Sequence, residues 1–267
     1  MAIIPSQQEL KKLDDLPEHS CQNCKMVYEG FYCPRCGQRY MEGRFKLKES
    51  AEWILAQIFN LDAGFFYTIW QLLLKPGEIT IDYLNKATRR YVHPFRFAFI
   101  VATLSALLTI LSGAFETTDL SQFATEKTEE GVQRVEAVFD FIKKYLSLIM
   151  LAVIPFYAMV AKWFYAKRKL NFTEHLIVAC YAYSFSLVIS WPLILLVLLP
   201  NGLFINGLVS FPATIVAMAW VYNKTFKEKF LISVLKLLLV SVVAFLIAMF
   251  FATLIGVITA LISKSFQ

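Results

Sequence analysis

Five long apolar stretches limit this 267-residue chain more than any other feature of its sequence. An α-helix rises 1.5 Å per residue, so about 20 apolar residues cross the hydrocarbon core of a bilayer. Only 17% of the residues are Asp, Glu, Lys or Arg, against about 25% in an average soluble domain. The sequence therefore predicts an α-helical integral membrane protein. Its five spans are expected at residues 95–115, 146–166, 176–199, 203–223 and 233–262.

The first 94 residues contain no stretch long enough to span a bilayer. Residues 1–20 form a polar tail, and residues 21–44 form a compact unit rich in Cys, Gly, Tyr and Arg. Residues 45–94 are expected to form amphipathic or interfacial helices, because apolar residues recur at helical spacing in short segments. These helices are expected at residues 46–60, 63–75 and 78–90.

The distribution of positive charge predicts the orientation of the spans. Cytoplasmic loops of membrane proteins carry an excess of Lys and Arg. The side that holds the N-terminus has 20 of these residues, and the opposite side has five. We therefore expect a cytoplasmic N-terminus, an external loop at residues 116–145, and an external C-terminus. The second half of that loop is expected to extend the second spanning helix. Lys236, near the start of the last span, is expected to reach the cytoplasmic headgroups.

Four cysteines form two C-x-x-C pairs eight residues apart, the one specific chemical motif of the chain. Two such pairs can supply the tetrahedral S₄ shell of a structural zinc ion, with no position left for a catalytic water. Two disulfides, a redox pair and an iron–sulfur centre are the alternatives. The cytoplasmic placement disfavours disulfides, and no βαβ pattern supports a thioredoxin-like site. We therefore expect one zinc ion bound by Cys21, Cys24, Cys33 and Cys36.

Three sequence segments together resemble a known family. They are CQNC–x8–CPRCGQR, LDAGFFYTIWQLLLKPG and DYLNKATRRYVHPFRF. The set is similar to an uncharacterised bacterial domain-of-unknown-function family of multi-pass membrane proteins with an N-terminal four-cysteine zinc ribbon. The resemblance covers about residues 20–115 and implies a ribbon, an interfacial region and a membrane bundle in a bacterial inner membrane. It implies no established activity.

Two further groups of residues have candidate roles. Basic residues gather where the chain is expected to enter the bilayer, and either bind lipid headgroups or another anion, or are ordinary cytoplasmic charge. This group comprises Arg89, Arg90, His93 and Arg96. Small residues recur every four positions along the last span, which favours close helix packing or a dimer contact. They are Ala244, Ala248, Ala252, Gly256 and Ala260, with the small residues of the spans at 95–115 and 176–199 as candidate partners.

The sequence favours a non-enzymatic membrane protein. In this interpretation the cytoplasmic ribbon docks a protein partner, and the bundle anchors, scaffolds or assists an envelope complex. A carrier for an uncharged or lipid-like substrate, and a membrane enzyme acting on lipid near the Arg/His group, are the alternatives. No span interior contains Asp, Glu or Arg, and the sequence contains no HExxH, Walker or Gly-x-Ser-x-Gly motif. Besides membrane lipids, we expect a protein partner or a second copy of the chain. The weakly basic ribbon disfavours nucleic acid.

Overall fold

The structure is a computed structural model, and it describes residues 18–41, 43–45, 64–115 and 129–265. Side chains are described for these ranges except at residues 129–131, 134, 248–249 and 251–265. Most of the predicted tail at 1–20, the helix predicted at 46–60 and the first part of the loop at 116–145 lie outside the described residues.

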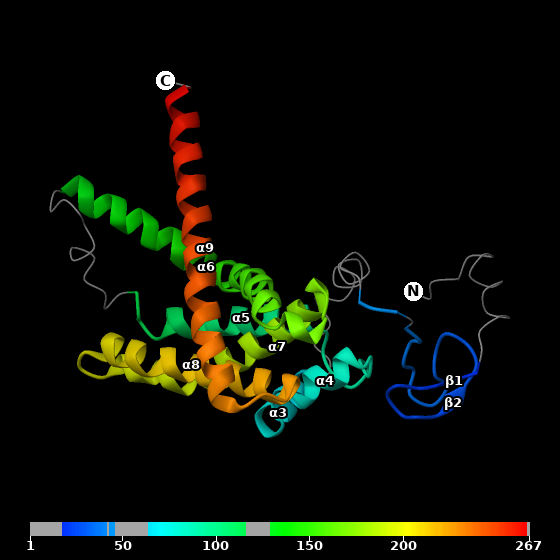
Figure 1. Ribbon diagram of the computed structural model, residues 1–267. Helices are drawn as coiled ribbons and strands as arrows, with labels where there is room; N and C mark the ends of the chain where they lie inside the picture. The colour runs from blue at the N-terminus through cyan, green and yellow to red at the C-terminus, as the bar shows by residue number, and fades with distance from the viewer. Residues whose placement is uncertain (1–17, 42, 46–63, 116–128, 266–267) are drawn as a thin grey trace, which may run out of the picture. The chain divides into compact units, whose positions relative to one another are not determined.

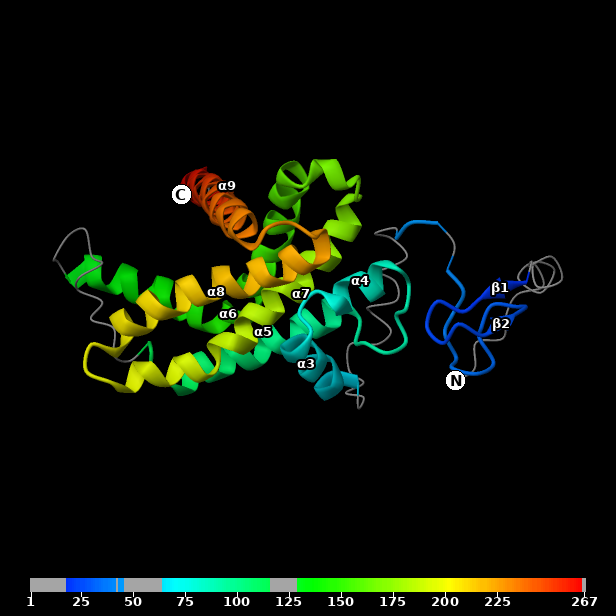
Figure 2. The ribbon, with the colours of Figure 1, turned by 60° about the horizontal axis from the view of Figure 1, so that its bottom comes forward.

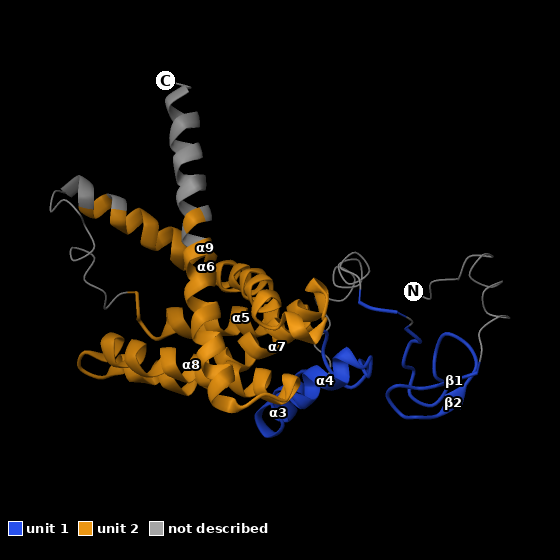
Figure 3. Ribbon diagram, viewed as in Figure 1, with its two compact units in different colours: residues 1–93 blue, residues 94–267 orange. Residues whose placement is uncertain are grey.

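The chain divides into two compact units, Met1–His93 and Pro94–Gln267 (Figure 3). The division falls one residue before the boundary expected between the interfacial region and the helical bundle. It coincides with Pro94, the first residue of a long helix, where a fixed φ and a missing N–H are tolerated.

Unit 1 begins with a small β-structure and continues with two short helices. Strands β1 (His19–Ser20) and β2 (Val27–Tyr28) pair antiparallel, with His19 opposite Tyr28. Helix α3 (Gly64–Leu74) has 11 residues, which at 1.5 Å per residue is too short to cross a bilayer. Helix α4 (Glu78–Leu84) follows after a turn at Gly77.

Helix α4 ends six residues before residue 90, where the sequence pattern placed its end. Lys86 adopts a left-handed φ of 67°, and its N–H donates to the Tyr83 carbonyl. The N–H of Ala87 donates to the Asp82 carbonyl, which completes a Schellman-type C-cap. No glycine marks this helix end, because a lysine occupies the left-handed position.

Unit 2 is helical. Its elements are α5 (Pro94–Leu111), α6 (Glu129–Phe164), the short 3₁₀ helix η2 (Ala166–Arg168), α7 (Phe172–Ser190), a second 3₁₀ helix η3 (Pro192–Leu198), α8 (Gly202–Phe226) and α9 (Phe230–Ser265) (Figure 1). Within the described residues, five helical segments are long and apolar enough to cross a membrane. They are Pro94–Leu111, Val135–Phe164, Phe172–Ser190, Gly202–Phe226 and Phe230–Ile247.

Helix α7 forms the centre of unit 2. It packs against α5, α6 and α8, and most of its side chains are buried. Asn171 caps its first turn, with the side chain accepting from the Glu174 N–H while the Glu174 carboxylate accepts from the Asn171 N–H. Helices α5, α7 and α8 run alongside one another in both views, and α9 stands steeply to them while it packs against α6 and α8 (Figures 1 and 2).

The third long helix differs from its prediction at both ends. It begins four residues earlier than expected, at Phe172, and ends at Ser190 instead of residue 199. Pro192 lacks the N–H that would continue the helix, so the chain changes to η3 and does not merely kink. The indole N–H of Trp191 donates to the Ser105 hydroxyl on α5 at 2.8 Å, which ties this break to a neighbouring helix.

Helix α6 extends the second predicted span toward its N-terminus, as the sequence pattern indicated. The helical assignment reaches back to Glu129, with one non-helical residue, Tyr145, at φ −110° and ψ 16°. Pro155 lies inside the helix. Near the middle of the bundle, the hydroxyl of Tyr157 on α6 donates to the Ser241 hydroxyl on α9 at 2.8 Å.

The described part of the small-residue stripe on α9 is packed. Ala244 is buried, whereas Phe245 and Leu246 are exposed. The side chains of Ala248, Ala252, Gly256 and Ala260 lie outside the described residues. The small residues of α5 and α7, expected as partners of this stripe, lie on helices that pack against each other, while α9 packs mainly on α6 and α8. Small residues allow helices to pack closely in this way in lipid.

Replacement of Ala244 with Leu should destabilise the bundle by about 1–3 kcal/mol, because the buried site has no room for a larger side chain. The thermal unfolding midpoint in neutral detergent should fall. Leu246→Ala is the control, since Leu246 is exposed on another face of α9. Equal unfolding midpoints for the two variants would show that packing around Ala244 does not stabilise the bundle.

Candidate metal centre

The first C-x-x-C pair lies in a tight turn that the backbone holds at both ends. The N–H of Cys21 donates to the Met26 carbonyl at 2.8 Å, and the N–H of Lys25 donates to the Cys21 carbonyl at 2.9 Å. Lys25 has a φ of 62°, in the left-handed region. The N–H of Cys24 also points toward the Cys21 sulfur, 3.5 Å away.

The second pair repeats this geometry twelve residues later. The N–H of Cys33 donates to the Gln38 carbonyl at 2.9 Å, and the N–H of Gly37 donates to the Cys33 carbonyl at 2.8 Å. Gly37 has a φ of 69°, in the left-handed region that favours glycine. The two turns are therefore structural equivalents, with lysine in the left-handed position of one and glycine in that of the other.

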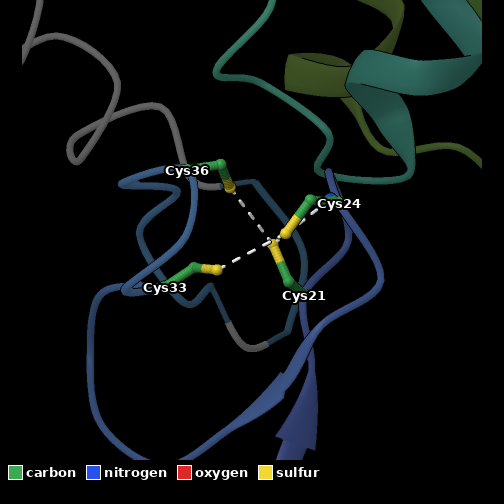
Figure 4. Close-up of side chains that lie close together, drawn as sticks. All are labelled: Cys21, Cys24, Cys33 and Cys36. Atoms are coloured by element: carbon green, nitrogen blue, oxygen red, sulfur yellow. Dashed lines mark hydrogen bonds between the residues drawn. The ribbon is translucent and has the colours of Figure 1, made fainter.

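The four sulfur atoms face one another (Figure 4). All lie within 4.8 Å of each other, with Cys21 Sγ 3.6 Å from Cys36 Sγ and Cys24 Sγ 3.5 Å from Cys33 Sγ. A tetrahedral ion with Zn–S bonds of about 2.3 Å would place its sulfurs about 3.8 Å apart. The four cysteines can therefore hold a metal ion.

The same geometry argues against a disulfide or redox pair. All four cysteines are free thiols, and a disulfide would need its sulfurs about 2.05 Å apart. The sulfur contacts at 3.6 and 3.5 Å join cysteines of different C-x-x-C pairs. A donor set of four thiols closes a tetrahedral shell, so the site is suited to holding structure.

Negative charge accumulates unevenly on these thiols. Burial acts to raise the pKa of Cys36, but hydrogen bonds from the Asn23 side chain and the Gln38 backbone outweigh it, and the pKa falls to about 6. A backbone hydrogen bond from Met26 acts to lower the pKa of Cys24, but burial and the other thiols raise it to about 11. A bound cation would relieve the repulsion that keeps the four thiolates from forming together.

Gln38 connects the second turn to a distant segment of unit 1. Its buried side chain donates to the Thr88 hydroxyl at 3.0 Å, and its amide oxygen accepts from the Arg89 N–H at 2.8 Å. Fifty residues separate these partners in sequence. The segment at 86–90 is thus bound to the turn that carries Cys33 and Cys36.

Two basic side chains of the same segment bind carbonyl groups of the cysteine region. Arg90 donates from Nη2 to the Asn23 carbonyl at 2.9 Å, within the first C-x-x-C pair. Lys86 donates from Nζ to the Met41 carbonyl at 3.2 Å and also to the Gly43 carbonyl. These hydrogen bonds attach the segment at 86–90 to the backbone around the cysteines.

The structure does not present the predicted anion-binding group as one exposed cluster. Arg89 and Arg90 are exposed in unit 1, whereas His93 and Arg96 are buried. Burial lowers the pKa of His93 to about 4, so its imidazole is neutral at pH 7. Of the four residues, the two arginines of unit 1 are the exposed cations, and both also contact the cysteine region.

Sequence reasoning missed Glu228, which organises one end of unit 2. Both of its carboxylate oxygens accept from Lys236 Nζ, at 2.9 and 2.8 Å, and Arg168 Nη2 lies 3.8 Å from one of them. Lys236 therefore pairs within the protein, where headgroup contact was expected. His175 of α7 is fully buried. A single acid between Lys227 and Lys229 was the available sequence signal.

Comparison with known proteins gives one match. The family model described as a protein of unknown function, DUF3667, matches residues 62–106. The matched segment includes α3, α4, the residues that bind the cysteine region, and more than half of α5. No curated protein and no solved structure matches the chain.

At the two equivalent left-handed positions, two substitutions should change the strength of metal binding in opposite directions. Gly37→Ala should weaken metal binding, because a residue with a Cβ costs roughly 1 kcal/mol or more at a left-handed φ. Lys25→Gly should not weaken it and should strengthen it slightly. Competition for Zn²⁺ against a chromophoric chelator measures both. A Cβ at Gly37 would meet only the Arg89 side chain, at 3.8 Å, so a clash would not explain the loss.

Proposed function

We propose that the chain is a non-enzymatic, multi-pass protein of a bacterial inner membrane whose cytoplasmic zinc ribbon docks a protein partner. In this proposal the helical bundle anchors the ribbon and scaffolds or assists an envelope complex. Five helices of sufficient length and apolarity support the membrane placement. The excess of 20 Lys and Arg over five on the opposite side supports the orientation.

Zinc is the proposed occupant of the cysteine site. A four-thiolate shell with sulfur separations near 3.8 Å suits zinc, which prefers tetrahedral sulfur ligands in structural sites. A bound ion would cross-link the two turns that carry the cysteines. Cys21, Cys24, Cys33 and Cys36 would hold it, and the segment at 86–90 would stabilise the surrounding backbone.

Exposed apolar side chains on the ribbon carry the docking proposal. Val27 is 54% exposed and Tyr32 is 63% exposed, and Met26 is also exposed. In the described part of this small domain, the apolar core consists of Cys21, Tyr28 and Cys33. Apolar side chains that stay in water add nothing to its stability. Aromatic residues and Met are enriched at protein interfaces, so these exposed side chains suit contact with a protein partner.

A carrier function is the second candidate, and a specific observation favours it. His175, Tyr222 and Ser184 are fully buried in unit 2. Neither ring nitrogen of His175 nor either hydroxyl has a hydrogen-bond partner among the residues that the structure describes. Buried polar groups are normally paired, so such groups inside a bundle fit contact with a polar solute. Transport of an uncharged solute by proteoliposomes, lost in His175→Phe, would support this candidate.

The lipid-enzyme alternative has less support. Asp82, its candidate acid, accepts a hydrogen bond from the Tyr91 hydroxyl at 2.8 Å. Arg90 binds the Asn23 carbonyl. Both groups therefore have structural roles within unit 1.

Purified protein should contain about one zinc per chain by elemental analysis. Cys33→Ser should abolish this zinc and increase amide hydrogen exchange in the ribbon, because the metal supplies most of the folding energy of so small a unit. Membrane insertion should be unchanged in the variant, as shown by resistance to carbonate extraction. Absence of zinc in the unaltered protein would contradict the assignment.

Reporter fusions should place Arg168 in the cytoplasm and both Thr128 and the C-terminus outside. The C-terminus is the most informative position, because α9 stands steeply to α5, α7 and α8. If α9 crosses the bilayer, the C-terminus is external. A cytoplasmic C-terminus would contradict the count of five spans, through a further span at 63–75 or a division of the last span at 231–262.

The docking proposal predicts that a stoichiometric protein partner co-purifies from native membranes. Val27→Glu combined with Tyr32→Glu should remove that partner, because the charges prevent burial of the exposed apolar surface. Gln22→Glu is the matched control, as it adds charge at an exposed polar position of the same ribbon. Zinc content should stay constant in all three proteins. A partner retained by the double variant would contradict docking through these side chains.

A further inference from the structure

Residues 86–92 connect the cysteine region of unit 1 with its two helices. The N–H of Ala87 donates to the Asp82 carbonyl of α4 at 2.9 Å. The N–H of Val92 donates to the Thr68 hydroxyl of α3 at 3.1 Å. Both ends of the segment are therefore held by contacts that do not involve the cysteine region.

Between these two anchors, residues 88–90 bind the cysteine region. The buried Gln38 side chain donates to the Thr88 hydroxyl at 3.0 Å and accepts from the Arg89 N–H at 2.8 Å. Arg90 donates from Nη2 to the Asn23 carbonyl at 2.9 Å. Asn23 belongs to the first C-x-x-C turn and Gln38 to the second, so these hydrogen bonds attach residues 88–90 to both turns.

Gln38 and Asn23 also contact one of the four thiols. The Gln38 backbone and the Asn23 side chain both hydrogen-bond to the Cys36 sulfur. Each of the two residues therefore binds a candidate metal ligand through one group and residues 88–90 through another. Partners of this kind orient metal ligands, and their loss typically lowers metal affinity about 10–100-fold. Thr88 and Arg90 lie one step further out and act through Gln38 and Asn23.

This chain of contacts makes metal binding and attachment of residues 88–90 reciprocal. If attachment raises the affinity for the ion, the bound ion must favour attachment by the same factor. A bound ion fixes the two turns relative to each other, because each turn supplies two of its ligands. Once the ion leaves, nothing holds Asn23 and Gln38 at the spacing that residues 88–90 require.

We propose that Thr88 and Arg90 are positioning residues of the metal centre, and that the ion controls whether residues 88–90 are attached to the cysteine region. Loss of the ion releases Arg89 and Arg90, just before Pro94 at the start of α5, while Ala87 and Val92 stay bound to the helices. The inference rests on the zinc site proposed above and deepens it. It gives the cysteine region a metal-dependent contact within the chain, in addition to the docking of a partner.

Two amide protons of the unaltered protein test the control by the ion. The Arg89 N–H donates to Gln38, whereas the Val92 N–H donates to Thr68 of α3. Removal of zinc by a chelator from the full-length protein in neutral detergent should speed exchange of the Arg89 amide by about tenfold or more. The Val92 amide should stay protected. Hydrogen exchange measured residue by residue reads both amides in one experiment.

Substitutions outside the cysteine region test the positioning role. Thr88→Val combined with Arg90→Gln removes two side-chain partners without changing a thiol or its neighbours in sequence. This double variant should bind Zn²⁺ about tenfold more weakly in competition with a chromophoric chelator. Arg89→Gln is the matched control, because it removes one positive charge but keeps the N–H that binds Gln38. It should bind Zn²⁺ as tightly as the wild type.

An unchanged Zn²⁺ affinity in the double variant, or an equal loss in Arg89→Gln, would overturn the positioning role. An Arg89 amide that exchanges equally fast with and without zinc would overturn the control by the ion. Equal acceleration at Val92 would do the same, since it indicates general unfolding of unit 1. The exchange measurement needs no substitution, so it remains decisive if a variant does not fold. Elemental analysis and partner retention test the zinc site and the docking surface separately.

Discussion

The burial of α7 against three other helices is the contact on which unit 2 depends. Backbone hydrogen bonds are satisfied within each helix, so the arrangement must come from side-chain packing, and in lipid that packing relies on small residues and a few polar contacts. Ala179, Ala182 and Ser186 of α7 are fully buried. The Trp191–Ser105 and Tyr157–Ser241 hydrogen bonds add specific links between helices. Such contacts select one arrangement among apolar surfaces that are otherwise alike.

The cysteine region at residues 21–44 meets a different physical limit, because it has too few residues to build an apolar core. Two turns of equal geometry bring four thiols together, and a bound ion would supply the cohesion that apolar burial cannot. Gln38, Arg90 and Lys86 attach residues 86–90 to this region through hydrogen bonds. The ribbon is thereby connected to the segment that the DUF3667 family model matches. A structural change at the metal site would therefore affect that segment through these hydrogen bonds.

These features fit a protein that positions a docking surface better than one that performs chemistry. The thiol site is closed, and the basic groups beside it bind backbone carbonyls. The apolar side chains exposed on the ribbon form the proposed docking surface for a protein. The buried polar groups around His175 and Tyr222 are the exception, and they keep the carrier interpretation open to a direct transport measurement.

Much of the architecture followed from the sequence, because its signals are local. Length and apolarity predicted the five long helices, and the C-x-x-C spacing predicted the cysteine cluster. Helix ends were less predictable: α4 ends at Leu84 and not at residue 90, and α7 ends before Pro192, inside the span predicted at 176–199. The pairing of Glu228 with Lys236 and Arg168, and of Gln38 with Thr88, joins residues that only chain folding brings together. Composition and periodicity carry no information about such contacts, since they depend on which faces of distant helices and loops meet.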